Sequence, residues 1–258
     1  MNTSSQSTTG VASKRAYVAA IAIILFFWQV AAWFLPDFLM PDVPVALARL
    51  WEELNSGEFY EGLGNSMSRL GIGYGAALFF GIILGLVGGT LDLVRSTLKA
   101  AIIILQSIPS IAWVPLFLIL MGFGNMPIIV VVAIGAFFPT ALSVMNATES
   151  VEKVHISAAR VMGASKMQML KRVYFPAVTP ELITGAQLAF GNAWRALISA
   201  EMIVGFSAGL GKSLAYSGEI ADMTGVMTNI LVIAILAAVI DQVILERIKH
   251  RLLRYQYL

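Results

Sequence analysis

The sequence predicts an all-α protein that crosses a membrane several times. Hydrophobic residues make up 58% of its 258 residues, charged residues only 12%, and the mean hydropathy is +0.81. A soluble domain normally has about twice that share of charged residues. The apolar residues also gather in runs of about twenty or more, the length that a helix needs to cross a bilayer core of about 30 Å.

The N-terminal region, residues 1–62, is predicted to hold a polar tail, a first span and a segment outside the cytoplasm. The first thirteen residues are rich in Ser and Thr, a composition typical of disorder. A basic pair then precedes an uncharged run that is too long for a signal peptide, so we expect a retained helix over 16–35. In the polar segment that follows, a short helix is expected over 45–56, with Pro44 at its start and Gly57 at its end.

Five further spans are predicted within residues 63–246, over 68–90, 98–121, 127–147, 177–204 and 226–246. Pro109 and Pro115 are expected to kink the 98–121 span, so that helix should face protein or a solute pathway. Glycines four residues apart, Gly71–Gly75 and Gly81–Gly85–Gly89, are expected to permit close helix packing.

The distribution of basic residues predicts which loops lie in the cytoplasm. If the N-terminus is inside, six spans place most of the Lys and Arg residues in loops 91–97 and 148–176 and in a basic tail, 247–258. The segments predicted outside, 36–65 and 205–225, contain only one Arg and one Lys. The positive-inside rule therefore predicts that both chain ends are cytoplasmic.

Several other functions are excluded by composition. The net charge of +2, with no Lys/Arg run interleaved with aromatic residues, argues against nucleic acid as a partner. Without cysteine there is no disulfide, thiol nucleophile or thiolate metal site. His155 and His250 lie far apart, so no metal centre is expected, and no group of residues is placed for catalysis. The Gly-Lys-Ser sequence at 211–213 is no phosphate-binding loop, because Phe206 occupies the position of its first glycine.

The longest polar stretch between spans, residues 149–176, is expected to form two short helices. Apolar residues recur near helical spacing on both sides of Gly163, where glycine accommodates a sharp bend. Pro176 suits the first turn of the next span. An exposed face that is both apolar and basic is either a surface for a partner protein or an amphipathic helix that lies on anionic lipid.

This stretch resembles the cytoplasmic coupling loop in membrane subunits of bacterial ATP-binding cassette (ABC) importers. The loop of that family reads Glu-Ala-Ala, three residues, Gly, nine residues, Ile-x-Leu-Pro. Here the two alanines, the glycine and the proline stand at the same spacing, two apolar residues replace Ile and Leu, and a serine replaces the leading Glu. The matching positions are Ser157, Ala158, Ala159, Gly163, Val173, Phe175 and Pro176.

Within these importers, the chain is similar over about residues 60–250 to permeases for nitrate, sulfonates and taurine. The segments that carry this likeness are 65–70, 108–116, 135–139, 200–203 and 209–211. The resemblance implies a type I importer permease fold in a bacterial inner membrane. It also implies two ATPase subunits that bind ATP and Mg, an extracytoplasmic solute-binding protein, and a second permease copy or a related subunit. This chain itself would bind no cofactor.

Polar residues inside the fifth span are the candidate solute contacts. An unpaired Arg at a helix centre costs about 2.5–3.5 kcal/mol to insert, so Arg195 needs a partner or a ligand. Glu201 lies about 9 Å farther along the helix and on another face, so a direct pair is awkward within one helix but feasible across a dimer axis. With Asn192 and Trp194, they are predicted to line a path for a small anionic solute. The alternatives for Arg195 are structural pairing or reaching the outer surface, which is also expected of Arg69.

A stand-alone secondary transporter or channel is the other function open to a chain of this composition. Such a protein would be expected to have coupled acidic residues in mid-membrane and an internal inverted repeat. Neither is clear in the sequence, and the 149–176 loop would have no role. The substrate itself is not predicted by the sequence.

Overall fold

The computed structural model describes residues 14–245 and 247, which fold into helices and connecting turns without strands. The predicted all-α class is therefore confirmed for this part of the chain. The predicted polar tail, and the basic tail apart from Arg247, lie outside the described residues. The main helices are α1 (Lys14–Phe34), α2 (Val43–Leu54), α3 (Gly57–Thr90), α4 (Asp92–Gln106), α5 (Val114–Met121), α6 (Asn125–Glu149), α7 (Lys153–Val161), α8 (Lys166–Met169), α9 (Phe175–Val204), α10 (Leu210–Glu219) and α11 (Met223–Val239).

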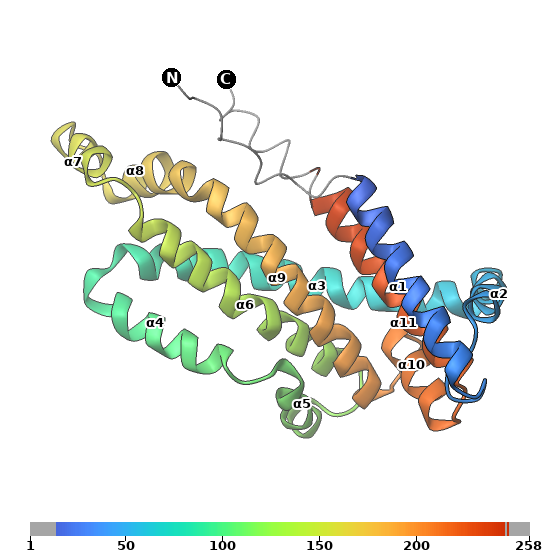
Figure 1. Ribbon diagram of the computed structural model, residues 1–258. Coiled ribbons are helices and arrows are strands. Elements are labelled where there is room, and N and C mark those ends of the chain that lie inside the picture. Colours follow the sequence, from blue (N-terminus) through green and yellow to red (C-terminus); the bar gives the residue numbers. More distant parts are fainter. Residues whose placement is uncertain (1–13, 246, 248–258) are drawn as a thin grey trace, which may run out of the picture.

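Helices α3, α6 and α9 form the centre of the fold, and α6 packs against both of the others along most of its length (Figure 1). The glycines of α3 explain how closely it approaches α6. Gly81, Gly85 and Gly89 all face α6, and a Cβ on Gly85 would lie only 2.6 Å from a side-chain carbon of that helix. The close-packing prediction is confirmed for these three. A Cβ added to either member of the predicted Gly71–Gly75 pair would instead meet no atom within 4 Å.

The predicted helix over 98–121 is broken rather than kinked. α4 ends at Gln106, a 3₁₀ turn, η1 (Ser110–Trp113), follows Pro109, and α5 then runs at 87° to α4. Pro109 has no backbone N–H and disfavours helical geometry in the residue before it, which accounts for the end of α4. The break leaves η1 and α5 packed against α6 and α9.

The short helix α2 begins as predicted, with Pro44 in its first turn. It ends at Leu54, so the prediction that Gly57 marks its end is wrong: Gly57 is the first residue of α3. The cause is Ser56, whose hydroxyl accepts a hydrogen bond from the Phe59 N–H at 3.3 Å and so caps α3.

The loop segment, residues 149–176, contains one separate helix rather than two. α7 is followed by a bend at Gly163, whose φ of +76° confirms the predicted role of this glycine. α8 then continues without a break through a π-helical turn, η2 (Leu170–Tyr174), into α9. Pro176 lacks the N–H that would complete regular helical bonding here, and the Phe175 N–H instead reaches back five residues to the carbonyl of Leu170.

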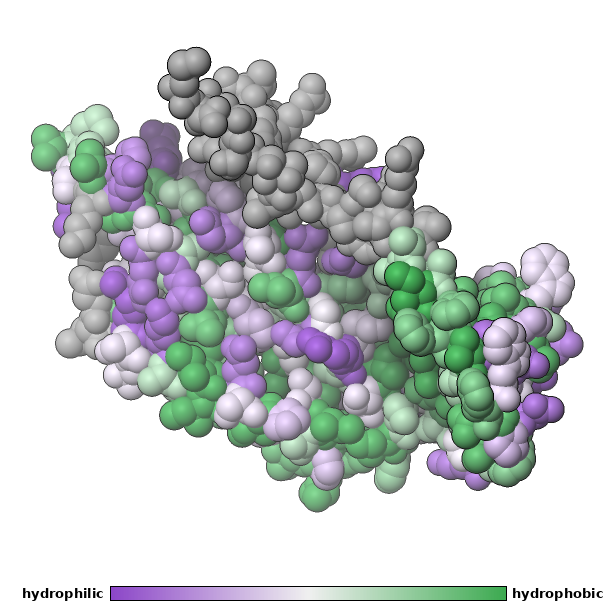
Figure 2. All heavy atoms as spheres, viewed as in Figure 1, coloured by the Kyte–Doolittle hydropathy of each residue, from purple (hydrophilic) through white to green (hydrophobic). Residues whose placement is uncertain are grey.

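Among the described residues, three helical segments are long and apolar enough to cross a membrane, or four if α4 and α5 form one broken span. They are Gly57–Thr90, Asn125–Glu149 and Met223–Val243, the last of which continues from α11 into the π-helical turn η3 (Ile240–Leu245). The predicted number of six is therefore not confirmed. Figure 2 shows hydrophobic side chains over α1 and α5, whereas hydrophilic ones gather where α6 and α9 lie.

Candidate functional site

Arg195 is an exposed arginine on α9 whose hydrogen bonds stay within its own helix. Its Nε–H donates to the carbonyl of Gly191 at 3.1 Å, and one terminal N–H donates to Asn192 Oδ1 at 2.7 Å. Both acceptors are neutral, and no carboxylate among the described residues pairs with this guanidinium. A guanidinium has five N–H donors, so three remain for an anion.

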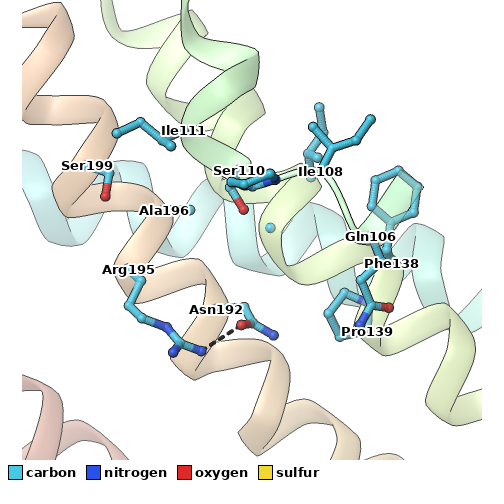
Figure 3. A pocket seen from close by; sticks show the side chains of 13 residues that line it. Gln106, Ile108, Ser110, Ile111, Phe138, Pro139, Asn192, Arg195, Ala196 and Ser199 are labelled. Carbon is cyan, nitrogen blue, oxygen red and sulfur yellow. Dashed lines mark hydrogen bonds between the residues drawn. The ribbon is translucent and has the colours of Figure 1, made fainter. Parts of the chain in front are cut away.

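A cavity of about 440 Å³ lies beside Arg195, between α9, α6 and the break after α4 (Figure 3). Gln106, Ser110, Asn192 and Ser199 give it polar atoms, and apolar residues of α6 complete it. Sequence reasoning missed Gln106, Ser110 and Ser199. The first two become neighbours of α9 only through the 87° break, and Ser199 carries no charge that would have singled it out.

A glycine of α6 fixes the width of this cavity. A Cβ on Gly135 would lie 3.0 Å from the Ala196 Cβ and 3.2 Å from the Ser110 hydroxyl. Because glycine has no side chain, α6, α9 and η1 come close together here, and the polar groups of Ser110 and α9 face the same space.

The other two residues predicted for the path differ from Arg195 in burial. Trp194 is 5% exposed and packs against Phe190, with ring centroids 6.2 Å apart, although its side chain also borders a second cavity between α9 and α11. Glu201 is 1% exposed and forms an ion pair with Arg69, with 2.5 Å between nitrogen and oxygen. Arg69 is itself only 3% exposed, so the expectation that it reaches the outer head groups is wrong.

The Arg69–Glu201 pair belongs to a buried network that joins α3, α9 and α10. Glu201 accepts hydrogen bonds from the Ser66 hydroxyl at 2.8 Å and from the Gly211 N–H at 2.9 Å, which places its negative charge at the N-terminus of α10. Arg69 also donates to Asn125 at 2.9 Å and to the hydroxyl of Ser207. All these acceptors lie on other helices or loops, so the network holds this end of the bundle together.

A second open, polar region lies along α6 and α9 on the loop-segment side of Arg195. A cavity of about 380 Å³ there is bordered by Asn146, Ser150, Glu181 and Thr184, which are all exposed. Glu181, Thr184, Leu188 and Arg195 recur three, four and seven residues apart, so they share one face of α9. That spacing was readable in the sequence, but Glu181 and Asn146 were not singled out there.

The loop segment presents an apolar surface that nothing in the described chain covers. Val154 of α7 is 73% exposed, and Val161 and Met162, just before the Gly163 bend, are 88% and 79% exposed. Of the residues that match the coupling-loop pattern, some are exposed, one is buried and one is half-buried. The exposed ones are Ser157, Ala158, Gly163, Phe175 and Pro176, the buried one is Ala159 and the half-buried one is Val173.

A family comparison gives this arrangement its context. The family described as binding-protein-dependent transport system inner membrane component matches residues 77–252, which include the cavity, the loop segment and all of α9. The chain belongs to this family. Its members are permease subunits of ABC transporters, which are not themselves enzymes, and they work with ATPase and binding-protein partners.

Curated relatives agree with that membership. The chain is 32% identical to the taurine transport system permease protein TauC of Escherichia coli over 231 residues, which cover 87% of this chain and 84% of the relative. It is 27% identical to the putative aliphatic sulfonates transport permease protein SsuC of Bacillus subtilis, over 91% and 85% of the two chains. Identity to the nitrate import permease protein NrtB of Synechocystis is 29%, over 72% and 70%.

Solved structures show the same fold. A chain from an inward-facing form of the MetNI methionine ABC transporter superposes with a TM-score of 0.64 at 22% identity, over 76% of this chain and 96% of that one. The present protein is therefore a membrane permease subunit of an ABC importer with the type I permease fold.

Proposed function

We propose that this permease forms, together with a second copy of itself, the path by which a small anionic solute enters the cell. The observation that carries this proposal is Arg195, an exposed guanidinium in the apolar part of α9 whose two hydrogen bonds go to neutral acceptors. A cation in such surroundings is stabilised by a negative charge, and the described residues pair none with it. The taurine, sulfonate and nitrate specificities in the names of the relatives fit an anion at this position.

The cavity beside Arg195 suits part of a shared path. It is open rather than enclosed, and the exposed polar residues Thr184 and Glu181 follow it along the same face of α9. Polar and charged groups in a membrane face protein or water rather than lipid. A second copy packed along this face would close the path and bring a second Arg195 toward the solute.

ATP-driven movement would enter through the loop segment. Two ATPase subunits, one on each permease copy, would grip the exposed surface around Ser157, Ala158 and Gly163. Because α8, η2 and α9 form one continuous helix, a displacement at Lys166 is transmitted over about 44 Å to Arg195. The other end of this helix is tied to α3 and α10 through Glu201, so it would tilt about a fixed outer end.

The charge distribution supports one orientation. The loop segment and the chain ends carry most of the basic residues, so both termini are cytoplasmic and the loop segment meets the ATPases there. The network around Glu201, together with α2 and α10, then faces outward. A solute-binding protein would release its ligand at that side.

Transport by the complete, reconstituted importer tests the role of Arg195. The assay measures uptake of labelled taurine, an alkanesulfonate and nitrate into vesicles that contain both permease copies, both ATPase subunits and the binding protein. Arg195→Gln is expected to lower uptake of the transported anion by about ten-fold or more, because it removes a charge-assisted contact. Arg195→Lys keeps the charge and should retain an intermediate rate.

A matched substitution separates this role from general damage. Arg49→Gln removes an exposed arginine of α2 that pairs only loosely with Glu52 and Glu53, at 3.5 and 3.7 Å, and should leave uptake unchanged. Normal uptake by Arg195→Gln at normal assembly would refute the anion path. Uptake by the permease without ATPase subunits would refute ATP coupling and favour a stand-alone transporter.

A further inference from the structure

A cavity of about 600 Å³ lies between the end of α3 and the start of the long α8–α9 helix, away from the Arg195 site. Its walls are mostly apolar: Val87 and Leu91 come from the end of α3, and Met167 and Leu170 come from α8 and η2. The π-helical turn contributes to this shape, because it widens the helix where Leu170 and Tyr174 line the cavity.

Two polar side chains at this cavity have no partner within the described residues. Arg160, in the last turn of α7, is exposed and has neither a hydrogen bond nor an ion pair there. The phenol of Tyr174 is half-buried and likewise makes no hydrogen bond in this part of the chain. A guanidinium and a phenol O–H at one apolar cavity can both donate to a single phosphate.

The position of the cavity relative to the membrane indicates which kind of molecule has both a phosphate and an apolar part. The long apolar stretch of α3 ends at Thr90 and Leu91, so the cavity lies where hydrocarbon gives way to water. Basic pockets between membrane helices on the cytoplasmic side bind anionic lipid head groups. Methionine is flexible and adapts to an acyl chain of variable shape.

We propose that this cavity binds an anionic phospholipid of the adjoining leaflet. The phosphate accepts hydrogen bonds from Arg160 and Tyr174, and an acyl chain lies against Val87, Leu91 and Met167. This inference rests on the cytoplasmic placement of the loop segment proposed above. The bound lipid bridges α3 and the two sides of the Gly163 bend, and so limits how far α7 moves relative to α8.

The lipid cavity does not include the residues proposed to meet the ATPase, Ser157, Ala158 and Gly163. The strongly exposed apolar residues Val154, Val161 and Met162 do not line the cavity. A partner protein can therefore cover them while Arg160 stays in contact with lipid. A free phosphate ion would satisfy Arg160 but would leave the apolar walls in water, which favours a phosphate that carries acyl chains.

Photolabelling of the complete importer in lipid vesicles tests this site. The probes are phosphatidylglycerol and phosphatidylcholine that carry the same photoreactive group on an acyl chain, and labelled peptides are located by mass spectrometry. Phosphatidylglycerol should label peptides 87–91 and 167–174 more strongly than phosphatidylcholine does. Arg160→Gln should lower that preference about five-fold, the contribution of one basic residue at a charged membrane surface. Tyr174→Phe should lower it by a smaller factor.

Arg172→Gln is the matched control, because Arg172 is an exposed arginine of η2, two residues from Tyr174, and does not line the cavity. Equal labelling by the two lipids would overturn the proposal. So would equal losses in Arg160→Gln and Arg172→Gln, or protection of the cavity by an ATPase side chain identified by crosslinking. Labelling does not require transport, so a permease that binds lipid here but moves no anion would refute only the proposed function.

Discussion

Arg69 in α3 is 3% exposed and donates hydrogen bonds to side chains from three other parts of the chain, whereas Arg195 in α9 is exposed and donates only within its own helix. The same physical rule applies to both, because a guanidinium in an apolar layer needs compensation. Glu201 compensates Arg69 in full, and the described part of the chain pairs no opposite charge with Arg195. The difference separates an arginine that stabilises the fold from one that is available to a ligand.

The glycines around the two arginines differ in the same way. Near Arg69, a Cβ on Gly209 would lie 2.8 Å from a Glu201 oxygen, and one on Gly211 would collide with the backbone oxygen of Ile198. Beside Arg195, a Cβ added to Gly191 would meet no atom within 4 Å. Gly209 and Gly211 at the Arg69 end are thus tightly surrounded, and the α9 face beside Arg195 is open.

Removal of the Arg69 charge should have the largest effect on stability. Arg69→Met leaves the Glu201 carboxylate buried without its cation, which typically costs about 3–5 kcal/mol. We expect a marked fall in the thermal unfolding temperature of the detergent-solubilised permease and in its level in the membrane. Arg195→Gln should change neither, because the hydrogen bonds of Arg195 join it to no other helix in the described structure.

The double variant Arg69→Met with Glu201→Gln distinguishes loss of charge balance from loss of packing. The amide carbonyl introduced by Glu201→Gln can still accept from the Gly211 N–H, and no charge is left uncompensated. The double variant should therefore be more stable than Arg69→Met alone. A double variant as unstable as the single one would mean that the pair contributes through shape rather than through charge.

Glycine substitutions should show the same contrast between the Arg69 and Arg195 regions, with smaller changes in stability. Gly211→Ala places a methyl group against the Ile198 carbonyl and the Glu201 Cβ, and overpacking of this kind costs about 1–3 kcal/mol. Gly191→Ala meets open space inside a helix, where alanine is favoured over glycine by about 1 kcal/mol. Thermal unfolding of the two variants measures this difference. Equal stability would show that the Arg69–Glu201 network relaxes as easily as the α9 face.

Local features of this fold were predictable from the sequence, and the contacts that depend on distant residues were not. The Gly163 bend follows from the conformational freedom of glycine, and the Gly81–Gly85–Gly89 packing follows from helical periodicity. The partner of Glu201 could not be deduced in this way, since Arg69 is 132 residues away in the chain.

The candidate site was predictable in part for the same reason. The insertion cost of an arginine drew attention to Arg195, and Asn192 lies within one turn of it. Gln106 and Ser110 reach the cavity only because α4 stops before Pro109 and the chain turns by 87°. A proline predicts an interruption, but the direction of the next helix is determined by its packing against α6 and α9.

The side chain of Glu53 in α2 is less buried than that of Arg69 and less exposed than that of Arg195. Its substitution should have the smallest effect on stability. Burial raises the pKa of Glu53, Arg49 lowers it and Asp222 raises it, and the net shift is upward from 4.5. A carboxyl whose folded pKa is raised stabilises the fold below its unfolded pKa, and that stability is lost as the pH rises through the folded value. Glu53→Gln should therefore raise the unfolding temperature slightly at pH 7 and leave it unchanged at about pH 4.

The exposed Glu61, which makes no ion pair within the described residues, gives the matched control. Glu61→Gln should produce no difference between the two pH values in the same thermal unfolding assay. Arg49 Nε and Glu53 Oε1 lie 3.7 Å apart. Destabilisation by Glu53→Gln at pH 7 would mean that the attraction between these two charges outweighs the free-energy cost of desolvating the carboxylate. A neighbouring opposite charge would then stabilise the fold at the half-buried surface around α2 as well as in the buried Arg69 network.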